Sequence, residues 1–275
     1  MDLTQFLLLA ATVVFGLACR SYGNRYLLKL GWIAYLAASY LGGWFLTGSH
    51  AAGAAGIALW FMLPWVEIVG RVRRLRLPVT SEVRHRFPPA RDVFPELGEL
   101  SEELEAAGFT RAGDTGWQWS ETDHFMRLFL HPEQRVQASV AQAQQRDLGL
   151  YVSYVSLTSR TPDGRAITTT NYPFVPTMSF SPAHRVQRVP DVGSLEELLG
   201  AHQDLLTSQG LTTAELAEPD PEALADLIER DLRAQVAHNL DTGLLEPAGE
   251  EGFIRYSWRG CAHLWLQVVK DMIRV

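Results

Sequence analysis

Three long apolar runs fill the first 69 residues of the chain, at positions 6–19, 30–46 and 51–69. The first two contain no charged side chain, and the third contains none before Glu67. A hydrocarbon core about 30 Å thick is crossed by roughly 20 apolar residues in a helix, and lipid offers no partner to bare backbone polar groups. The pattern therefore predicts three N-terminal transmembrane helices, which form an anchor over residues 1–76.

Basic residues are unevenly distributed over the short loops between these runs. Three lie between the first two runs, none lies in residues 47–50, and four arginines follow the third run. These four are Arg71, Arg73, Arg74 and Arg76. Because short cytoplasmic loops are enriched in Lys and Arg, we predict a multi-pass protein of the inner (cytoplasmic) membrane. Its N-terminus lies outside, and everything after Leu75 lies in the cytoplasm.

The first apolar run has two alternative interpretations. A secretory signal begins with positive charge and ends in a small-residue cleavage site, whereas this chain begins with Asp2 and no Lys or Arg nearby. A two-span protein, with the first run in the membrane interface, would disturb the alternation of basic loops. We therefore expect three uncleaved spans, with Glu67 paired to Arg71 four residues on rather than marking an ion path. Small residues spaced four apart, as at Ser39/Gly43 and Ala52/Gly56, allow such helices to pack closely.

The rest of the chain reads as an α+β domain. Residues 77–92 contain three prolines and predict a linker, and the leucine spacing after Phe94 predicts a helix to Ala107. Short aromatic and β-branched segments between residues 109 and 180 then predict strands, with turns such as 161–164 between them. Consecutive strands joined by short turns form an antiparallel β-meander.

Helices are also predicted after the meander in the sequence. Ser194 and Glu197 form a capping box before a leucine stripe, and Asp220 with Pro221 begins a longer helix. Because the helices at 94–107 and 194–209 each carry one apolar stripe, we expect both to cover one face of a single antiparallel sheet. The predicted division is a cytoplasmic α+β domain at 93–210 and a helical C-terminal segment at 211–275.

The segment from Tyr256 onward is an amphipathic helix with aromatic and aliphatic residues on one side and basic residues on the other. Such a helix can lie in the membrane interface, or it can belong to the core of the soluble domain. The interface is favoured because this is the basic stretch of an acidic domain. The residues expected at the membrane interface are Arg71, Arg73, Arg74, Arg76, Trp258, Trp265, Lys270 and Arg274.

Charge divides the chain in the same way. Residues 1–78 hold seven Lys or Arg and two Asp or Glu, a net +5, and the remainder holds 17 and 29, a net −12. Phosphate contacts require clustered basic side chains, so a nucleic-acid partner is not expected. The expected partners are the lipid bilayer and a protein of a membrane complex.

Sequence motifs for catalysis are absent: GxSxG, HExxH, GxxxxGK[ST] and GxGxxG do not occur. Cys19 and Cys261 have no neighbours at metal-ligand spacing, so neither a metal site nor a cofactor is expected. Four residues of the predicted sheet remain as ligand-binding candidates: Asp123, His124, His131 and Arg165. His124 and His131 are seven residues apart, so they point to opposite faces of a regular strand. His202, within a leucine stripe, is expected to be a core histidine.

Two hypotheses for function follow. The first is a membrane-anchored cytoplasmic binding or interaction protein, a non-catalytic component of a membrane complex, because the domain is well patterned but lacks a catalytic or metal motif. The alternative is a membrane-bound enzyme with an unrecognised site on the β-sheet. The alternative requires a pocket that gathers at least two of the four candidate residues within hydrogen-bond reach.

Overall fold

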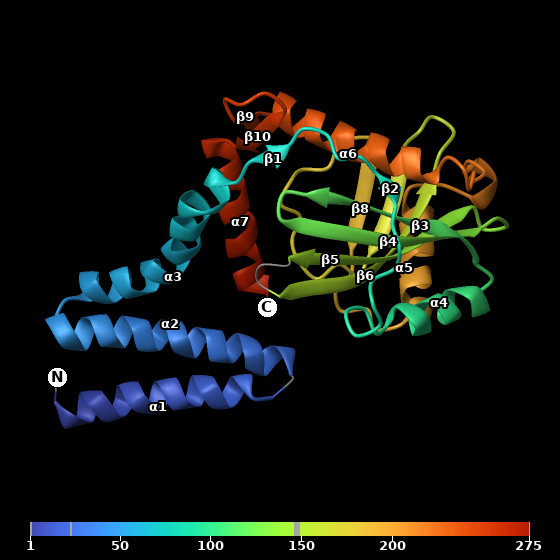
Figure 1. Cartoon of the computed structure of the whole chain (residues 1–275). Helices are drawn as coiled ribbons and strands as arrows, with labels where there is room; N and C mark the ends of the chain where they lie inside the picture. The colour runs from blue at the N-terminus through green and yellow to red at the C-terminus, as the bar shows by residue number, and fades with distance from the viewer. Residues whose placement is uncertain (1, 23, 146–148, 275) are drawn as a thin grey trace. The chain divides into compact units, whose positions relative to one another are not determined.

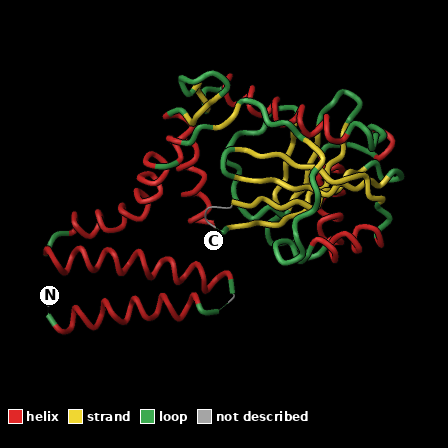
Figure 2. The backbone as a smooth tube through the Cα atoms, viewed as in Figure 1, coloured by secondary structure: helices red, strands yellow, loops and turns green. Residues whose placement is uncertain are grey.

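A computed structural model describes residues 2–22, 24–145 and 149–274 of the chain. It has two compact units, shown in Figures 1 and 2. The helical unit comprises Met1–Arg74 and Trp258–Val275, and the α+β unit comprises Leu75–Ser257. In sequence, the α+β unit is thus inserted between two segments of the helical unit.

The helical unit contains four helices and a short 3-10 turn in its described part. They are α1 (Leu3–Arg20), α2 (Arg25–Thr47), α3 (His50–Gly70), η1 (Val72–Arg74) and α7 (Trp258–Arg274). Asp2 begins α1 with a capping box to Gln5, and α2 ends at Gly48, whose φ of 73° reverses the chain. The helix α2 runs antiparallel to α1 and packs against both α1 and α3 (Figure 1).

Two segments of the described chain, Leu3–Arg20 and His50–Arg74, are long and apolar enough to cross a membrane. Only 11% of each apolar window is buried inside the protein, which differs from the core helix of a soluble protein. The helix α2 does not qualify, because tyrosine, tryptophan, glycine and serine residues interrupt its aliphatic side chains. Two helices, not the three predicted, thus qualify as candidate spans by their own length and composition.

Close packing between α2 and α3 explains the small residues of these helices. A Cβ atom at Gly43 would lie 2.5 Å from the carbonyl oxygen of Ala52, and one at Gly56 would lie 2.6 Å from that of Ser39. Both distances are far below van der Waals contact, so each position requires glycine. The small-residue spacing thus serves contacts within this chain.

The α+β unit is built on a seven-stranded sheet in the order β2-β3-β4-β5-β6-β7-β8. Its strands are β2 (Arg84–His85), β3 (Thr110–Trp119), β4 (Thr122–His131), β5 (Val136–Gln145), β6 (Leu150–Arg160), β7 (Ala166–Thr170) and β8 (His184–Arg188). Pairing is antiparallel from β2 to β7, which confirms the predicted meander. The strand β8 pairs parallel to β7, so the sheet is mixed and not purely antiparallel as predicted.

Helices lie on both faces of this sheet (Figure 1). The helices α4 (Leu97–Ala106) and α5 (Leu195–Ser208) place Leu97, Leu104 and Leu198 in one buried cluster with residues of β4, β5 and β6. On the other face, Leu224 of α6 (Leu224–Asp241) packs with Leu128 and Leu130. A 3-10 turn, η3 (Thr213–Glu215), precedes α6. The helices α4 and α5 share one face because each carries a single apolar stripe.

A second sheet, of three strands, joins the beginning and the end of the α+β unit. It has the order β1-β10-β9, with β1 (Leu77–Pro78), β9 (Leu245–Pro247) and β10 (Phe253–Tyr256). Leu77 lies opposite Ile254, so the strand that enters the unit pairs with the strand that leaves it. Residues 77–92, expected to form a linker, therefore contain β1 and β2, and the unit continues beyond residue 210 to Ser257.

The C-terminal helix α7 belongs to the helical unit. The Trp265 indole N–H donates to the carbonyl oxygen of Phe61 at 2.6 Å, and its ring meets Trp65 edge-on at 6.2 Å. The guanidinium of Arg73 lies 4.1 Å from the ring centroid of Trp258. The alternative that α7 is a core helix of the soluble domain is thus wrong.

Candidate binding site

Two of the four residues predicted to bind a ligand, Asp123 and His124, line a common pocket of about 340 Å³. The other two lie elsewhere. His131 ends β4, where its ring meets Phe109 edge-on at 5.1 Å. Arg165 follows a turn after β6, is exposed, and pairs with Asp163 at 2.9 Å. The four residues therefore do not form one site.

The pocket lies between the start of β4, the end of β5 and residues 86–93, which lead from β2 towards α4. We call it the Arg86 pocket, and it is lined by Arg86, Phe87, Pro89, Ala90, Val93, Asp123, His124, Phe125, Gln142 and Gln144. Gln142 is buried and donates its side-chain amide to the carbonyl oxygen of Val93 at 2.8 Å. This bond attaches the 86–93 segment to the sheet.

An ion pair crosses the polar end of the pocket. The Nη1 atom of Arg86 lies 3.0 Å from Oδ1 of Asp123, and the two side chains are 33% and 14% exposed. Arg86 reaches Asp123 next to Gly116 of β3, where a Cβ atom would lie 2.8 Å from Cδ of Arg86. The same Cβ atom would lie 2.1 Å from the His124 carbonyl oxygen, so the backbone requires glycine at this position.

His124 is not placed for acid–base chemistry near neutral pH. Its ring stacks on Trp117, its partner across the strands, at 4.7 Å between centroids and 9° between planes. Burial lowers the pKa of His124 to about 4, although the neighbouring Asp123 carboxylate opposes this shift. The imidazole is therefore neutral under physiological conditions.

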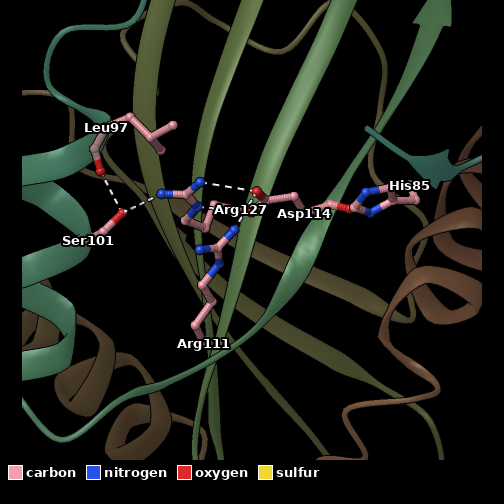
Figure 3. Close-up of polar contacts among 6 residues, drawn as sticks. All are labelled: His85, Leu97, Ser101, Arg111, Asp114 and Arg127. Atoms are coloured by element: carbon pink, nitrogen blue, oxygen red, sulfur yellow. Dashed lines mark hydrogen bonds and ion pairs between the residues drawn. The ribbon is translucent and has the colours of Figure 1, made fainter. Parts of the chain in front are cut away.

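A polar network around the buried side chain of Asp114 holds both ends of the segment that forms the pocket (Figure 3). Arg127 donates to Asp114 through Nε at 2.9 Å and Nη2 at 3.0 Å, and Arg111 donates to Asp114 at 2.6 Å. Arg127 also donates to Ser101 of α4 at 3.3 Å. The Asp114 carbonyl oxygen accepts from Nδ1 of His85 in β2 at 2.9 Å. One carboxylate and its backbone thus connect β2, β3, β4 and α4.

A second buried histidine has a structural role. Nε2 of His202 lies 3.1 Å from the Ser159 hydroxyl, and Nδ1 lies 3.0 Å from the Thr169 hydroxyl. One ring nitrogen donates and the other accepts, so both are satisfied. Burial lowers the pKa of His202 to about 4. The prediction of a core histidine at this position is confirmed.

The residues predicted at the membrane interface fall into both units. Arg71 lies 3.9 Å from Glu67, as predicted, and Arg73 contacts Trp258. Arg74 ends η1, while Arg76 belongs to the α+β unit and pairs with Glu250. In α7, Trp265 contacts α3 and Lys270 is exposed, whereas the side chain of Arg274 lies outside the described residues. Their location at a membrane surface stays a prediction.

Several pocket residues escaped sequence reasoning because residues 77–92 read as a linker. Arg86, Phe87 and Ala90 lie in that segment, and Gln142 and Gln144 lie at the end of a strand without any motif. The signal that could have revealed the site is Gly116, which lies in the region 109–180 predicted to form strands, because a glycine in a strand often marks a close approach of another chain segment.

Three further features would indicate a function: metal-ligand groups, disulfides and similarity to known proteins. In residues 2–22, 24–145 and 149–274, no group of three His, Cys, Asp or Glu side chains could hold a metal ion. Cys19 and Cys261 are both buried, and neither is in a disulfide. No protein-family model, curated protein or solved structure matches the chain. The Arg86 pocket and the helical unit are the features from which a function can be inferred.

Proposed function

We propose that this protein is a membrane-anchored, non-catalytic binding protein that holds a polar segment of a partner protein in the Arg86 pocket. The observation that carries the proposal is the partly desolvated Arg86–Asp123 ion pair in a pocket with apolar walls. Binding pockets combine an apolar lining with a few placed polar groups that orient the ligand.

The chemistry of the pocket favours a peptide over a charged small molecule. Arg86 and Asp123 neutralise each other, and Gln144 adds an amide that can both donate and accept. Backbone N–H and C=O groups of a peptide match such mixed donors and acceptors. At the rim, Phe87 is 85% exposed, and exposed aromatic side chains are frequent anchors in protein interfaces.

The apolar surface of the helical unit supports the anchor. The windows in Leu3–Arg20 and His50–Arg74 leave most of their apolar surface uncovered by protein, which lipid would cover. The helix α2 does not qualify as a span by its own composition, but it packs against both α1 and α3 and would therefore lie at the same depth and cross with them. We propose three spans with the N-terminus outside and the α+β unit in the cytoplasm. The reason is that Lys and Arg lie on both sides of the loop between α1 and α2 and in the segment after α3, whereas residues 47–50, where α2 ends and α3 begins, contain none.

The enzyme hypothesis is not proposed further. It required a pocket that gathers at least two of the four candidate residues within hydrogen-bond reach. Asp123 and His124 do line one pocket, but the contacts of both oppose a catalytic role. Asp123 is paired with Arg86, and His124 is neutral and stacked on Trp117. His131 and Arg165 lie away from the pocket.

The anchoring can be tested with protease on intact and permeabilised cells. We expect the α+β unit to survive in intact cells and to be digested after permeabilisation, and the protein to stay in membranes washed with alkaline carbonate. Digestion in intact cells would overturn the orientation. Release by carbonate would overturn the anchor itself.

Binding at the Arg86 pocket can be tested by placing a photo-crosslinking residue at Phe87 of the full-length protein. Phe174, which is 58% exposed in the same unit and does not line the pocket, is the matched control position. We expect one defined protein adduct at position 87, lost when Arg86→Ala or Asp123→Ala is added, and absent at position 174. Identical adducts at both positions, or an adduct insensitive to both substitutions, would refute the proposal.

A further inference from the structure

A second cavity, of about 270 Å³, lies within the helical unit between α2, α3 and α7. Its walls are Trp32, Ile33 and Leu36 from α2, Trp60 and Phe61 from α3, and Met272 from α7. Among the described residues, Lys29 is the one charged side chain that lines it. We call this cavity the α2–α3–α7 groove, and its lining suits a hydrocarbon chain rather than a polar molecule.

Aromatic contacts and a hydrogen bond fix the walls of the groove. Trp32 meets Trp60 edge-to-face with centroids 5.9 Å apart, which sets the spacing of α2 and α3. Across the groove, the hydrogen bond from Trp265 to the Phe61 carbonyl oxygen holds α7 against α3. The groove is therefore formed by packed elements and not by a single mobile side chain.

Lys29 indicates the chemistry of a ligand that would suit the groove. It is half-buried in the second turn of α2, and in the described part of the chain it makes no ion pair. An ammonium group with apolar neighbours is unfavourable unless an anion accompanies it. A second cation lies nearby, since the guanidinium of Arg20 stands 5.0 Å from the ring centroid of Trp32.

We propose that the α2–α3–α7 groove binds an anionic phospholipid, with an acyl chain between the aromatic walls and its phosphate against Lys29 and Arg20. This inference rests on the proposed membrane anchor and names a lipid that the anchor selects. The proposed orientation places Lys29 at the cytoplasmic leaflet, where anionic lipids are enriched. Basic pockets between transmembrane helices on that side are known to hold anionic headgroups.

Native mass spectrometry of the full-length protein in detergent tests this site. The protein is incubated with phosphatidylglycerol or with phosphatidylcholine of the same acyl chains. One basic residue near an anionic group changes binding by about fivefold, so we expect at least that preference for phosphatidylglycerol. Lys29→Gln should abolish the preference. Lys270→Gln alters the only other lysine of the chain, which is exposed on α7, and should keep it.

The acyl-chain part of the site needs its own variants. Leu36→Trp fills the groove and should reduce retention of both lipids, whereas Leu63→Trp, at an exposed position of α3 outside the groove, should not. Soluble glycerol phosphate should not displace the bound lipid. Displacement by glycerol phosphate, equal retention of the two lipids, or equal effects of Lys29→Gln and Lys270→Gln would each overturn the proposal.

The carbonate wash of membranes separates this result from the proposed anchor. If the wild-type protein washes off, the anchor itself fails and the groove has no bilayer from which to take a lipid. If the protein resists carbonate but shows no lipid preference, only the lipid site fails.

Discussion

Arg86 and Asp123 lie 37 residues apart in the chain, and they meet beside a glycine. A side chain at Gly116 would collide with Cδ of Arg86 and with the backbone of the neighbouring strand. A comparison of Arg86 with His202 shows which site residues can be predicted from the sequence. His202 was predictable, because a histidine within a leucine stripe has few alternatives to a satisfied core position. Arg86 was not, because its neighbour on β4 is set by strand register and by one missing methyl group.

Gly116→Ala should destabilise the α+β unit by about 1–3 kcal/mol, the usual cost of overpacking a site that cannot relax. Gly113→Ala on the same strand is the matched control, because its Cβ atom would meet nothing within 4 Å. We expect Gly113→Ala to leave the free energy of unfolding almost unchanged. Urea unfolding of both variants decides the matter, and equal costs at the two positions would contradict the close approach described here.

His202 should make folding sensitive to acid. Its pKa falls from 6.5 in the unfolded chain to about 4 in the folded protein, so the unfolded state binds more protons between these values. The contribution of neutral His202 to the free energy of unfolding is complete above pH 6.5 and is lost as the pH falls. The loss amounts to about 2 kcal/mol between pH 7 and pH 5.

The variant His202→Gln should therefore lose less stability than the wild type over that interval. His124 has a pKa lowered to about the same value, so His124→Gln should remove a second, additive share. Urea unfolding at pH 7 and pH 5 gives both quantities. A variant His202→Gln that remains as acid-sensitive as the wild type would rule out the assignment.

At the level of elements, the sequence predicted the helices and the meander well. Their apolar stripes and turn residues are local signals, and the structure places α4, α5 and β3–β7 accordingly. The strands β2 and β8 were missed, since they are two and five residues long and pair with distant or parallel neighbours. Such pairing depends on tertiary contacts that no local pattern encodes.

The pairing of α7 with α3 was also not predicted, and one hydrogen bond offers a test of it. Pro64 lacks an N–H group and interrupts the hydrogen bonds of α3, close to the Phe61 carbonyl oxygen that accepts from Trp265. Trp265→Phe keeps an aromatic ring but removes the donor, which should cost about 1 kcal/mol of stability in detergent.

The control for this variant is Trp65→Phe. Trp65 supplies the other ring of the edge-on pair, and Trp65→Phe makes the same change of side chain. Thermal unfolding of the two variants in detergent should therefore rank Trp265→Phe as the less stable. The reverse order would show that ring packing, and not the indole hydrogen bond, joins α7 to α3.

For the whole molecule, the limits of the α+β unit lead to a prediction about fragments. The unit includes β1, β2, β9 and β10 and spans Leu75–Ser257. We expect residues 75–257 to fold as a cooperative, soluble fragment. A fragment that begins at Phe94 lacks β1, β2 and the Arg86 pocket segment, so it should be less stable and expose apolar surface.

Both fragments can be compared by urea unfolding and by dye binding to exposed apolar surface. A fragment from Phe94 that is as stable as 75–257 would mean that the segment 77–92 is the linker that its prolines suggest. Hydropathy alone could not decide the number of spans for a related reason. The helix α2 combines aromatic and small residues that suit packing against α1 and α3, and these lower its apolar character.

The pairing of β1 with β10 has a consequence for turnover. The chain leaves the helical unit at Arg74, returns to it at Trp258, and the two connections begin on neighbouring strands. A protease that cuts at one junction leaves the α+β unit covalently attached through the other. A cut at the Trp258 junction leaves the unit joined to α3 by the chain itself. After a cut at the Arg74 junction it is joined to α7 alone, so only the packing of α7 against α3 and the hydrogen bond from Trp265 to Phe61 would retain it.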